Sequence, residues 1–235
     1  MSHAASPTRA ALLRTLAENL PEPSGLSHPL RVGIDGVSAS GKTILADELA
    51  DHLRAQGRHV IRAGLDGFHN SPAIRHRLGP SSAEGYLRDS FDYAAARTHL
   101  LEPLGPGGNL RYRSAAYDHH AERPLETPLL SAPSASVLIF EGVMLFRPEL
   151  APCFDYKILV QVTFDVALER ARSRDLPKFG SMETLLQKYN QRFIPGQKRY
   201  LAANQPETQA QAIIQNEDPA NPTLHFPPAV PAQTT

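Results

Sequence analysis

The chain has 235 residues, in which 24 lysines and arginines balance 24 aspartates and glutamates, and hydrophobic residues make up 41%. This length and composition are ordinary for a globular protein and suffice for one large α/β domain or two small ones. A formal net charge of zero argues against a general basic coat for nucleic acid, so no nucleic-acid partner is expected.

Cys153 is the single cysteine, which excludes an intramolecular disulfide and any cysteine-rich metal or iron–sulfur site. A reducing compartment fits this, and no apolar stretch approaches the roughly 20 residues that span a bilayer. We therefore expect a cytoplasmic protein without a membrane partner. His69 and His76, like His119 and His120, lack a partner set at zinc-ligand spacing, so no zinc site is expected.

In chain order, the sequence divides into an N-terminal helix and linker (1–29), a core (30–218) and a tail (219–235). Apolar residues recur at helical spacing after Pro7, which suits the first turn of a helix. A cluster of prolines then marks the linker, and the tail is again rich in proline. The chemistry is therefore expected in the core.

Within the core, short apolar runs alternate with segments of helical periodicity. The expected strands cover residues 30–34, 59–63, 137–140, 158–164 and 212–214. The expected helices cover residues 43–55, 92–101, 166–173 and 182–192. Residues 70–90 are polar and are expected to be irregular. This alternation predicts a parallel sheet with helices on both faces.

The strongest motif is Gly36-Val-Ser-Ala-Ser-Gly41-Lys42-Thr43, between a predicted strand and a predicted helix. It fits the P-loop, or Walker A, pattern. Gly36 and Gly41 allow backbone angles that a side chain would block, so the loop amides can converge on phosphate oxygens at the helix N-terminus. Lys42 reaches the β- and γ-phosphates, and the Thr43 hydroxyl can hold Mg²⁺. The expected nucleotide-binding residues are Gly36, Ser38, Ala39, Ser40, Gly41, Lys42 and Thr43.

Two carboxylates follow predicted strands. Asp66, in Gly64-Leu-Asp66-Gly-Phe-His69, comes directly after the second strand, where a side chain faces the ligand crevice of a parallel sheet. It is expected near the γ-phosphate, where it can accept a hydroxyl proton; a turn or helix-capping aspartate is the alternative. Glu141 ends the apolar run Val137-Leu-Ile-Phe140, which is like a Walker B strand. It is expected near the metal, with an ordinary strand-end charge as the alternative.

These three elements together resemble the uridine kinase and phosphoribulokinase-like branch of P-loop kinases, over roughly residues 30–218. That branch also includes pantothenate and nicotinamide riboside kinases. Asp66-Gly-Phe-His69 is similar to its Asp-x-Phe-Tyr segment, and Phe140-Glu-Gly142 to its Phe-Glu-Gly segment. The resemblance implies a three-layer P-loop NTPase fold, with a parallel sheet flanked by helices and a helical lid. It also implies ATP and Mg²⁺ as cofactors.

Two further segments resemble uridine kinases in particular. Phe91-Asp92-Tyr93 is similar to a segment whose aspartate holds the ribose hydroxyls, and Tyr117-Asp118 to one beside the pyrimidine base. The resemblance implies that Asp92 and Tyr117 bind the acceptor; a helix N-cap and a packed aromatic are the alternatives. Glu122 stands where the family has histidine. Its acceptor-only carboxylate favours an amino-bearing ring such as cytosine, or a non-nucleoside, unless a neighbouring histidine supplies the donor.

A basic cluster follows the fourth predicted strand, with Arg170, Arg172, Arg174 and Lys178. In kinases of this type a helical lid places arginines over the transferring phosphate, where charge stabilisation matters. Arg174 is the best candidate for this role. The alternative is a solvated helix face whose arginines pair with nearby carboxylates.

The sequence therefore predicts an ATP-dependent small-molecule kinase that transfers the γ-phosphate to a hydroxyl of a uridine- or cytidine-like nucleoside. Asp66, Lys42 and Arg174 are the expected catalytic residues, and Thr43 and Glu141 the expected Mg²⁺ ligands. One alternative is a kinase for pantothenate, nicotinamide riboside or a sugar. Another is a nucleotide-binding regulatory protein without turnover. The expected partners are ATP and the acceptor, and a homo-oligomer is left open.

Overall fold

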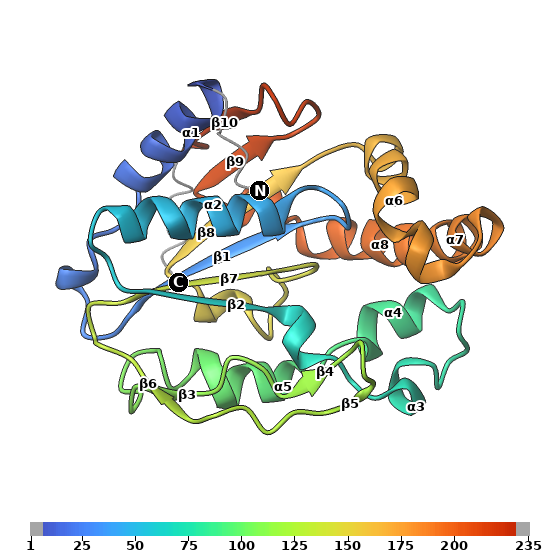
Figure 1. The fold of residues 1–235 in the computed structure, drawn as a ribbon, viewed down its shortest axis with the longest axis horizontal. Helices are drawn as coiled ribbons and strands as arrows, with labels where there is room; N and C mark the ends of the chain where they lie inside the picture. The colour runs from blue at the N-terminus through green and yellow to red at the C-terminus, as the bar shows by residue number, and fades with distance from the viewer. Residues whose placement is uncertain (1–6, 229–235) are drawn as a thin grey trace.

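A six-stranded sheet forms the centre of the molecule, as the computed structural model, which describes residues 7–228, shows (Figure 1). Its strand order is β10-β9-β8-β1-β7-β2, and every neighbouring pair is parallel except β9 with β10. The strands are β1 (Leu30–Gly36), β2 (Val60–Gly64), β7 (Val137–Gly142), β8 (Tyr156–Gln161), β9 (Ala212–Gln215) and β10 (Thr223–His225).

The strands separate two hydrophobic cores because successive side chains of a strand point to opposite faces. Leu30 and Val32 of β1 lie in one core. Leu138 and Phe140 of β7 lie in the other. Burial on both faces explains why these strands read as continuous apolar runs in the sequence.

Helices α1 (Pro7–Glu18) and α2 (Lys42–Ala55) cover the first face together (Figure 1). Leu16 of α1 and Leu49 of α2 are fully buried in the same core as β1. Arg9 also forms an ion pair with Glu48 at 2.6 Å. The N-terminal helix is therefore packed onto the core, while the division into residues 1–29, 30–218 and 219–235 stays a prediction.

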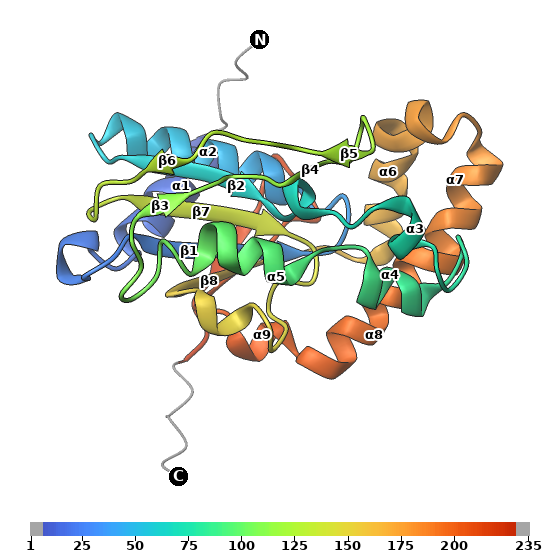
Figure 2. The same cartoon turned by 90° about the horizontal axis from the view of Figure 1, so that it is seen from below.

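The second face carries shorter elements, which lie below the sheet in Figure 1. Leu100 and Leu101, in a π-helical turn that continues α5, are fully buried against this face. The pairs β3–β6 and β4–β5 are antiparallel. The elements here are α5 (Tyr93–Ala96), β3 (Arg111–Tyr112), β4 (Tyr117–Asp118), β5 (Arg123–Pro124) and β6 (Leu130–Ser131). Helix α9 (Pro206–Gln209) follows α8 (Ile194–Asn204) and is labelled in Figure 2.

Five helices gather beyond one end of the sheet, as both views show (Figures 1 and 2). They are α3 (Pro72–Arg75), α4 (Ala83–Asp89), α6 (Phe164–Phe179), α7 (Met182–Lys188) and α8 (Ile194–Asn204). A π-helical turn, Tyr189–Phe193, joins α7 to α8. We call α6, α7 and this turn the lid. Among residues 7–228, no helix has both the length and the apolar character to cross a membrane.

Three sequence predictions of secondary structure were wrong. Residues 70–90 are not irregular, because they contain α3 and α4, and the Ser82 hydroxyl caps α4 by accepting from the Gly85 amide at 3.0 Å. The helix expected to end at residue 192 continues to Asn204, since Pro195 falls in the first turn of α8, where a missing N–H is tolerated. The fourth strand ends at Gln161 and not at 164, because Thr163 caps α6.

Candidate active site

The loop between β1 and α2 depends on its two glycines. Gly41 has φ 97°, and a Cβ there would lie 2.5 Å from Nδ2 of Asn216. A Cβ at Gly36 would lie 2.4 Å from the carbonyl oxygen of Val160. Close contacts therefore require glycine at both positions, and Gly41 also has a backbone angle that favours glycine, as the sequence predicted for this residue. The loop ends at the N-terminus of α2, which favours anions.

Lys42 lies at the centre of this loop and is 7% exposed. Its Nζ donates to the carbonyl oxygen of Val37 at 2.9 Å. Burial lowers the pKa of Lys42, and the carboxylates of Glu141, Asp35 and Asp66 act in the opposite direction. Three acids thus favour a charged ammonium group beside the loop amides.

Thr43, in the first turn of α2, lies next to Glu141, near the carboxyl end of β7. The Thr43 hydroxyl donates to Oε1 of Glu141 at 3.2 Å. Burial raises the pKa of Glu141, while the charges of Lys42 and Arg62 oppose the shift. Two hard oxygen ligands next to a phosphate site fit Mg²⁺, which takes few protein ligands beside phosphates and water. Within residues 7–228, no group of three or more His, Cys, Asp or Glu side chains could hold a metal.

Asp66 lies in a 3₁₀ turn, Leu65–Phe68, that begins directly after β2. Its side chain is 66% exposed, and Nδ1 of His69 is 4.0 Å from its Oδ1. It faces the same cavity as Lys42. The structure therefore places an accessible carboxylate in a cavity that also borders Lys42, and its catalytic role stays a prediction.

Two cavities meet at the P-loop. The first has a volume of about 190 Å³ and is lined by residues that include Asp66, Glu141 and the aromatic side chains of Tyr86 and Phe193. The second, of about 580 Å³, lies towards Arg9, Ile44, Arg170 and Asn216. The residues that border both cavities are Ala39, Lys42, Thr43 and Arg174. A group bound by Lys42 would therefore be reachable from both sides.

Arg174, on α6, is one of the residues shared by the two cavities. Its guanidinium donates to both carboxylate oxygens of Asp175, at 2.7 and 2.9 Å. The hydrogen bond with Asp175 raises the pKa of Arg174 further above its ordinary value. By contrast, Arg170 binds the Asn216 carbonyl at 2.6 Å and Arg172 pairs with Glu169 along the helix.

The residues expected to bind the acceptor do not line the first cavity. Oδ1 of Asp92 accepts from the Ala95 amide at 2.8 Å and so caps α5. The Tyr117 hydroxyl donates to Glu122 at 3.1 Å, and Glu122 pairs with Arg75 at 2.6 Å. Their roles stay predictions. The sequence neighbours Phe91 and His119 line the cavity instead.

The model of the family described as Phosphoribulokinase / Uridine kinase family matches residues 31–220. The chain belongs to this family. The fold is thereby that of the P-loop kinases, a mostly parallel sheet flanked by helices, as the sequence predicted.

Two curated relatives and one solved structure illustrate the similarity. Uridine-cytidine kinase A of Dictyostelium discoideum is 29% identical over 70% of this chain, which spans only 32% of that protein's length. Uridine kinase of Vibrio campbellii is 28% identical over 70% of this chain and 77% of its own. The solved structure of a possible uridine kinase from Bacillus stearothermophilus has a TM-score of 0.67 at 22% identity. It covers 87% of this chain and 95% of that one, and it shows the shared fold.

Tyr86 is a cavity residue that sequence reasoning about this family member missed. It is 7% exposed and packs on Phe193 with ring centroids 5.0 Å apart. Burial raises the pKa of its phenol, and a hydrogen bond with Ser38 of the P-loop opposes the shift. A Cβ at Gly196 would lie 2.7 Å from this ring, so α4 and α8 are in close contact here. The signal that could have found it is the N-cap Ser82, which marks the start of α4.

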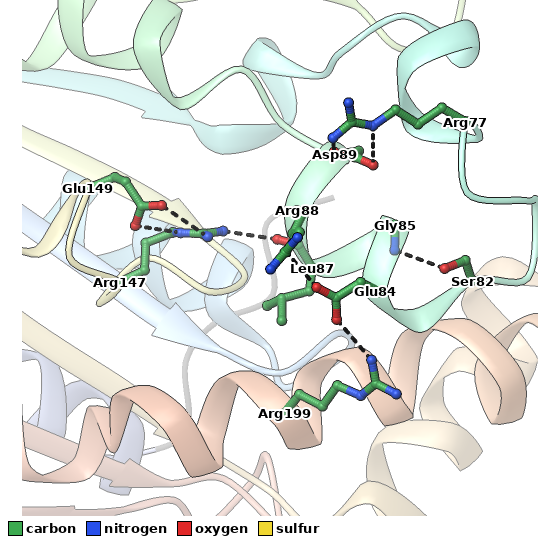
Figure 3. Close-up of polar contacts among 10 residues, drawn as sticks. All are labelled: Arg77, Ser82, Glu84, Gly85, Leu87, Arg88, Asp89, Arg147, Glu149 and Arg199. Carbon is green, nitrogen blue, oxygen red and sulfur yellow. Dashed lines mark hydrogen bonds and ion pairs between the residues drawn. The ribbon is translucent and has the colours of Figure 1, made fainter.

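Helix α4, which carries Tyr86, is held from several sides (Figure 3). Glu84 pairs with Arg199 of α8 at 2.9 Å. Arg147, from the segment after β7, donates to the Leu87 carbonyl at 3.0 Å, and Arg77 pairs with Asp89 at 2.7 Å. This part of the cavity wall is therefore fixed to α8 and to the segment that follows β7.

Two histidines extend the wall near Asp66. The rings of His69 and His119 are stacked with centroids 4.9 Å apart. Because the carbonyl oxygen of Asp66 can only accept, Nδ1 of His69, 2.9 Å away, carries the hydrogen. Burial lowers the pKa of both histidines, against the charge of Asp66. Neutral imidazoles thus line the cavity at neutral pH.

This lowered pKa predicts acid sensitivity of the fold. When the pH falls, His69 takes up a proton more readily in the unfolded chain than in the folded protein, so acid favours unfolding. The stabilisation from neutral His69 is therefore full above a pH of about 6.5 and is lost as the pH falls below it. Each unit of lowering is worth about 1.4 kcal/mol. When the pH is lowered from about 7.5 to about 5.5, we expect the free energy of unfolding to fall less for His69→Gln than for the wild type, as measured by urea denaturation. The exposed His225 provides a His→Gln control. Equal losses in wild type and His69→Gln would contradict the assignment.

Proposed function

We propose that this protein is an ATP-dependent kinase that transfers the γ-phosphate to a hydroxyl of a small molecule, with a uridine- or cytidine-like nucleoside as the first acceptor to test. The observation that carries the proposal is the convergence of Lys42, Asp66 and Arg174 on one cavity beside the P-loop. The uridine and uridine-cytidine kinases among its relatives support the nucleoside.

In this proposal the donor nucleotide places its phosphates on the loop Gly36–Thr43 and its nucleoside in the second cavity. The size of that cavity, about 580 Å³, and its position beside Gly41 and Arg170 support this. Thr43 and Glu141 would hold Mg²⁺, which supplies positive charge to the phosphates. The acceptor then occupies the first cavity, on the other side of Lys42.

The transfer itself needs a base and compensating positive charge. Asp66 takes the proton of the acceptor hydroxyl as the oxygen attacks the γ-phosphorus, and the bond from that phosphorus to the bridging oxygen of ADP breaks. Lys42 and Arg174 stabilise the charge on the moving phosphoryl group, because phosphoryl transfer depends mainly on positioning and electrostatics. The Arg174–Asp175 pair keeps this guanidinium at the border of the two cavities.

A second acceptor class has its own support. Asp92, Tyr117 and Glu122 already bind other groups of the protein and lie outside the first cavity. An acceptor without a ribose, such as pantothenate, would not depend on them; nicotinamide riboside and sugars are the other candidates.

On the grounds of the single cysteine, we also propose a cytoplasmic location.

The deciding experiment is ADP release from Mg-ATP in the presence of single nucleosides, pantothenate, nicotinamide riboside or sugars. We expect turnover with one class of acceptor, and turnover lowered by about 10³-fold or more with Lys42→Ala. Activity with uridine or cytidine supports the nucleoside, and activity only with another compound replaces it. An absence of turnover together with tight ATP binding would instead support a regulatory nucleotide-binding protein.

A further inference from the structure

One helical face leads from the first cavity to the P-loop. Tyr189 and Phe193 line the cavity. Gln197 comes four residues after Phe193, and Tyr200 comes three residues after Gln197. Residues at these spacings share one side of a helix. Helix α8 runs from the lid back towards the sheet (Figure 1). The acceptor side and the phosphate side therefore contact the same element.

Gln197 binds the P-loop directly. It is 2% exposed, and its Oε1 accepts from the backbone amide of Ser38 at 2.6 Å. Its Nε2 donates to the Phe193 carbonyl at 3.1 Å. Because both ends of the side-chain amide are engaged, its orientation is fixed. The Ser38 amide is thus held by α8, at a position 159 residues away in the chain.

Tyr200 holds the entrance of the loop through Asp35, the last side chain before Gly36. Its hydroxyl donates to Oδ2 of Asp35 and accepts from the Phe146 amide at 2.9 Å. The other oxygen of Asp35 accepts from the Gly36 amide at 2.7 Å. Asp35 and Tyr200 are 0% and 3% exposed, so this chain of hydrogen bonds is shielded from water.

Ala39 gives the loop a third contact, with the lid. It has φ 61°, a conformation that favours glycine, yet its methyl group is buried in a cluster with Ala171, Leu185 and Tyr189. The side chain at this position therefore packs against α6, α7 and the π-helical turn. Helix α8 therefore contacts the start of the P-loop through Asp35 and its middle at Ser38. The lid contacts the loop at Ala39.

We propose that Gln197 and Tyr200 are positioning residues, which keep the P-loop in its phosphate-binding shape and connect that shape to the helix lining the acceptor cavity. The inference rests on the proposed function, because the phosphates concerned are those of ATP. Without the Gln197 oxygen the loop loses a contact that fixes the Ser38 amide. ATP must then order the loop as it binds, which costs free energy, and binding should weaken about tenfold.

The test compares Gln197→Met, which keeps the length of the side chain but no hydrogen-bonding group, with Tyr200→Phe, which removes one hydroxyl. Lys198→Ala is the matched control, since Lys198 lies on α8 and its Nζ sits 5.5 Å from the Phe164 ring. The dissociation constant of Mg-ATP is measured by titration calorimetry, and the melting temperature without nucleotide is measured in parallel. We expect about tenfold weaker binding for Gln197→Met, a smaller loss for Tyr200→Phe, and wild-type binding for Lys198→Ala.

The outcomes separate this inference from the proposed function. If the wild type binds ATP and both variants bind it equally well, the positioning role is wrong while the kinase assignment stands. If the wild type does not bind ATP, both are wrong. If Gln197→Met does not fold, Tyr200→Phe decides alone. A lower melting temperature with unchanged ATP affinity would show a purely structural role and would overturn the inference.

Discussion

Replacing Lys42 by alanine should lower kcat for phosphoryl transfer by about 10³-fold or more and leave the fold intact. The ammonium group is buried at the centre of the P-loop and borders both cavities. Removing one preorganised group that stabilises charge in a water-poor site typically costs 10²–10³ in rate. Here the same group also binds the ground-state phosphates, so the loss should be at least that large. The measurement is kcat and KM for ATP with whichever acceptor is active.

The fold of Lys42→Ala is checked by circular dichroism and by its melting temperature without nucleotide. Lys198→Ala serves as a control for the loss of a lysine. A correctly folded Lys42→Ala protein with wild-type turnover would contradict the assignment of the P-loop as the donor site.

Asp66→Asn should lower kcat by about 10²–10⁴-fold, the range typical of a positioned general base, with little change in ATP binding. The amide keeps the size of the side chain but can neither accept the proton nor carry its charge. Asp66 borders the cavity from the turn after β2 and does not belong to the P-loop, so the dissociation constant of Mg-ATP should change far less than kcat.

The matched control for this change is Asp51→Asn, because Asp51 lies on α2 and its side chain is 77% exposed. Both variants are assayed for kcat and for ATP binding. If Asp66→Asn changes kcat less than about threefold, Asp66 has a structural role only. If it weakens ATP binding as much as it slows turnover, the carboxylate acts on the nucleotide and not on the acceptor.

The parts of the site that lie at strand ends could be predicted from sequence, since local pattern and sheet topology determine them together. Burial on both faces makes β1 and β7 apolar runs, and their carboxyl ends meet at one edge of the sheet. Thr43 and Glu141 are 98 residues apart, yet their oxygens lie 3.2 Å apart. Thr43 could be predicted from the P-loop pattern, and Glu141 from the apolar run that it ends.

The acceptor side could not be predicted in the same way, because it depends on contacts between helices. Asp92 fits both a ribose-binding aspartate and a helix N-cap in the sequence, and only the structure shows its bond to the Ala95 amide. Tyr86 and Gln197 belong to no motif, and each acquires its surroundings from an element far away in the chain. Apolar periodicity locates such helices but does not show which polar side chain reaches the loop.

Ala39 also links the backbone energetics of the P-loop to the packing of α6 and α7. A left-handed backbone costs an ordinary residue about 1–2 kcal/mol, and burying one methyl-sized group returns about 0.8 kcal/mol. Burial of the methyl group in the cluster with Ala171, Leu185 and Tyr189 therefore offsets part of the strain at Ala39. Any rearrangement that separated α6 and α7 from the loop would expose this methyl group and leave the strain uncompensated, so its free energy would include a contribution from the loop backbone.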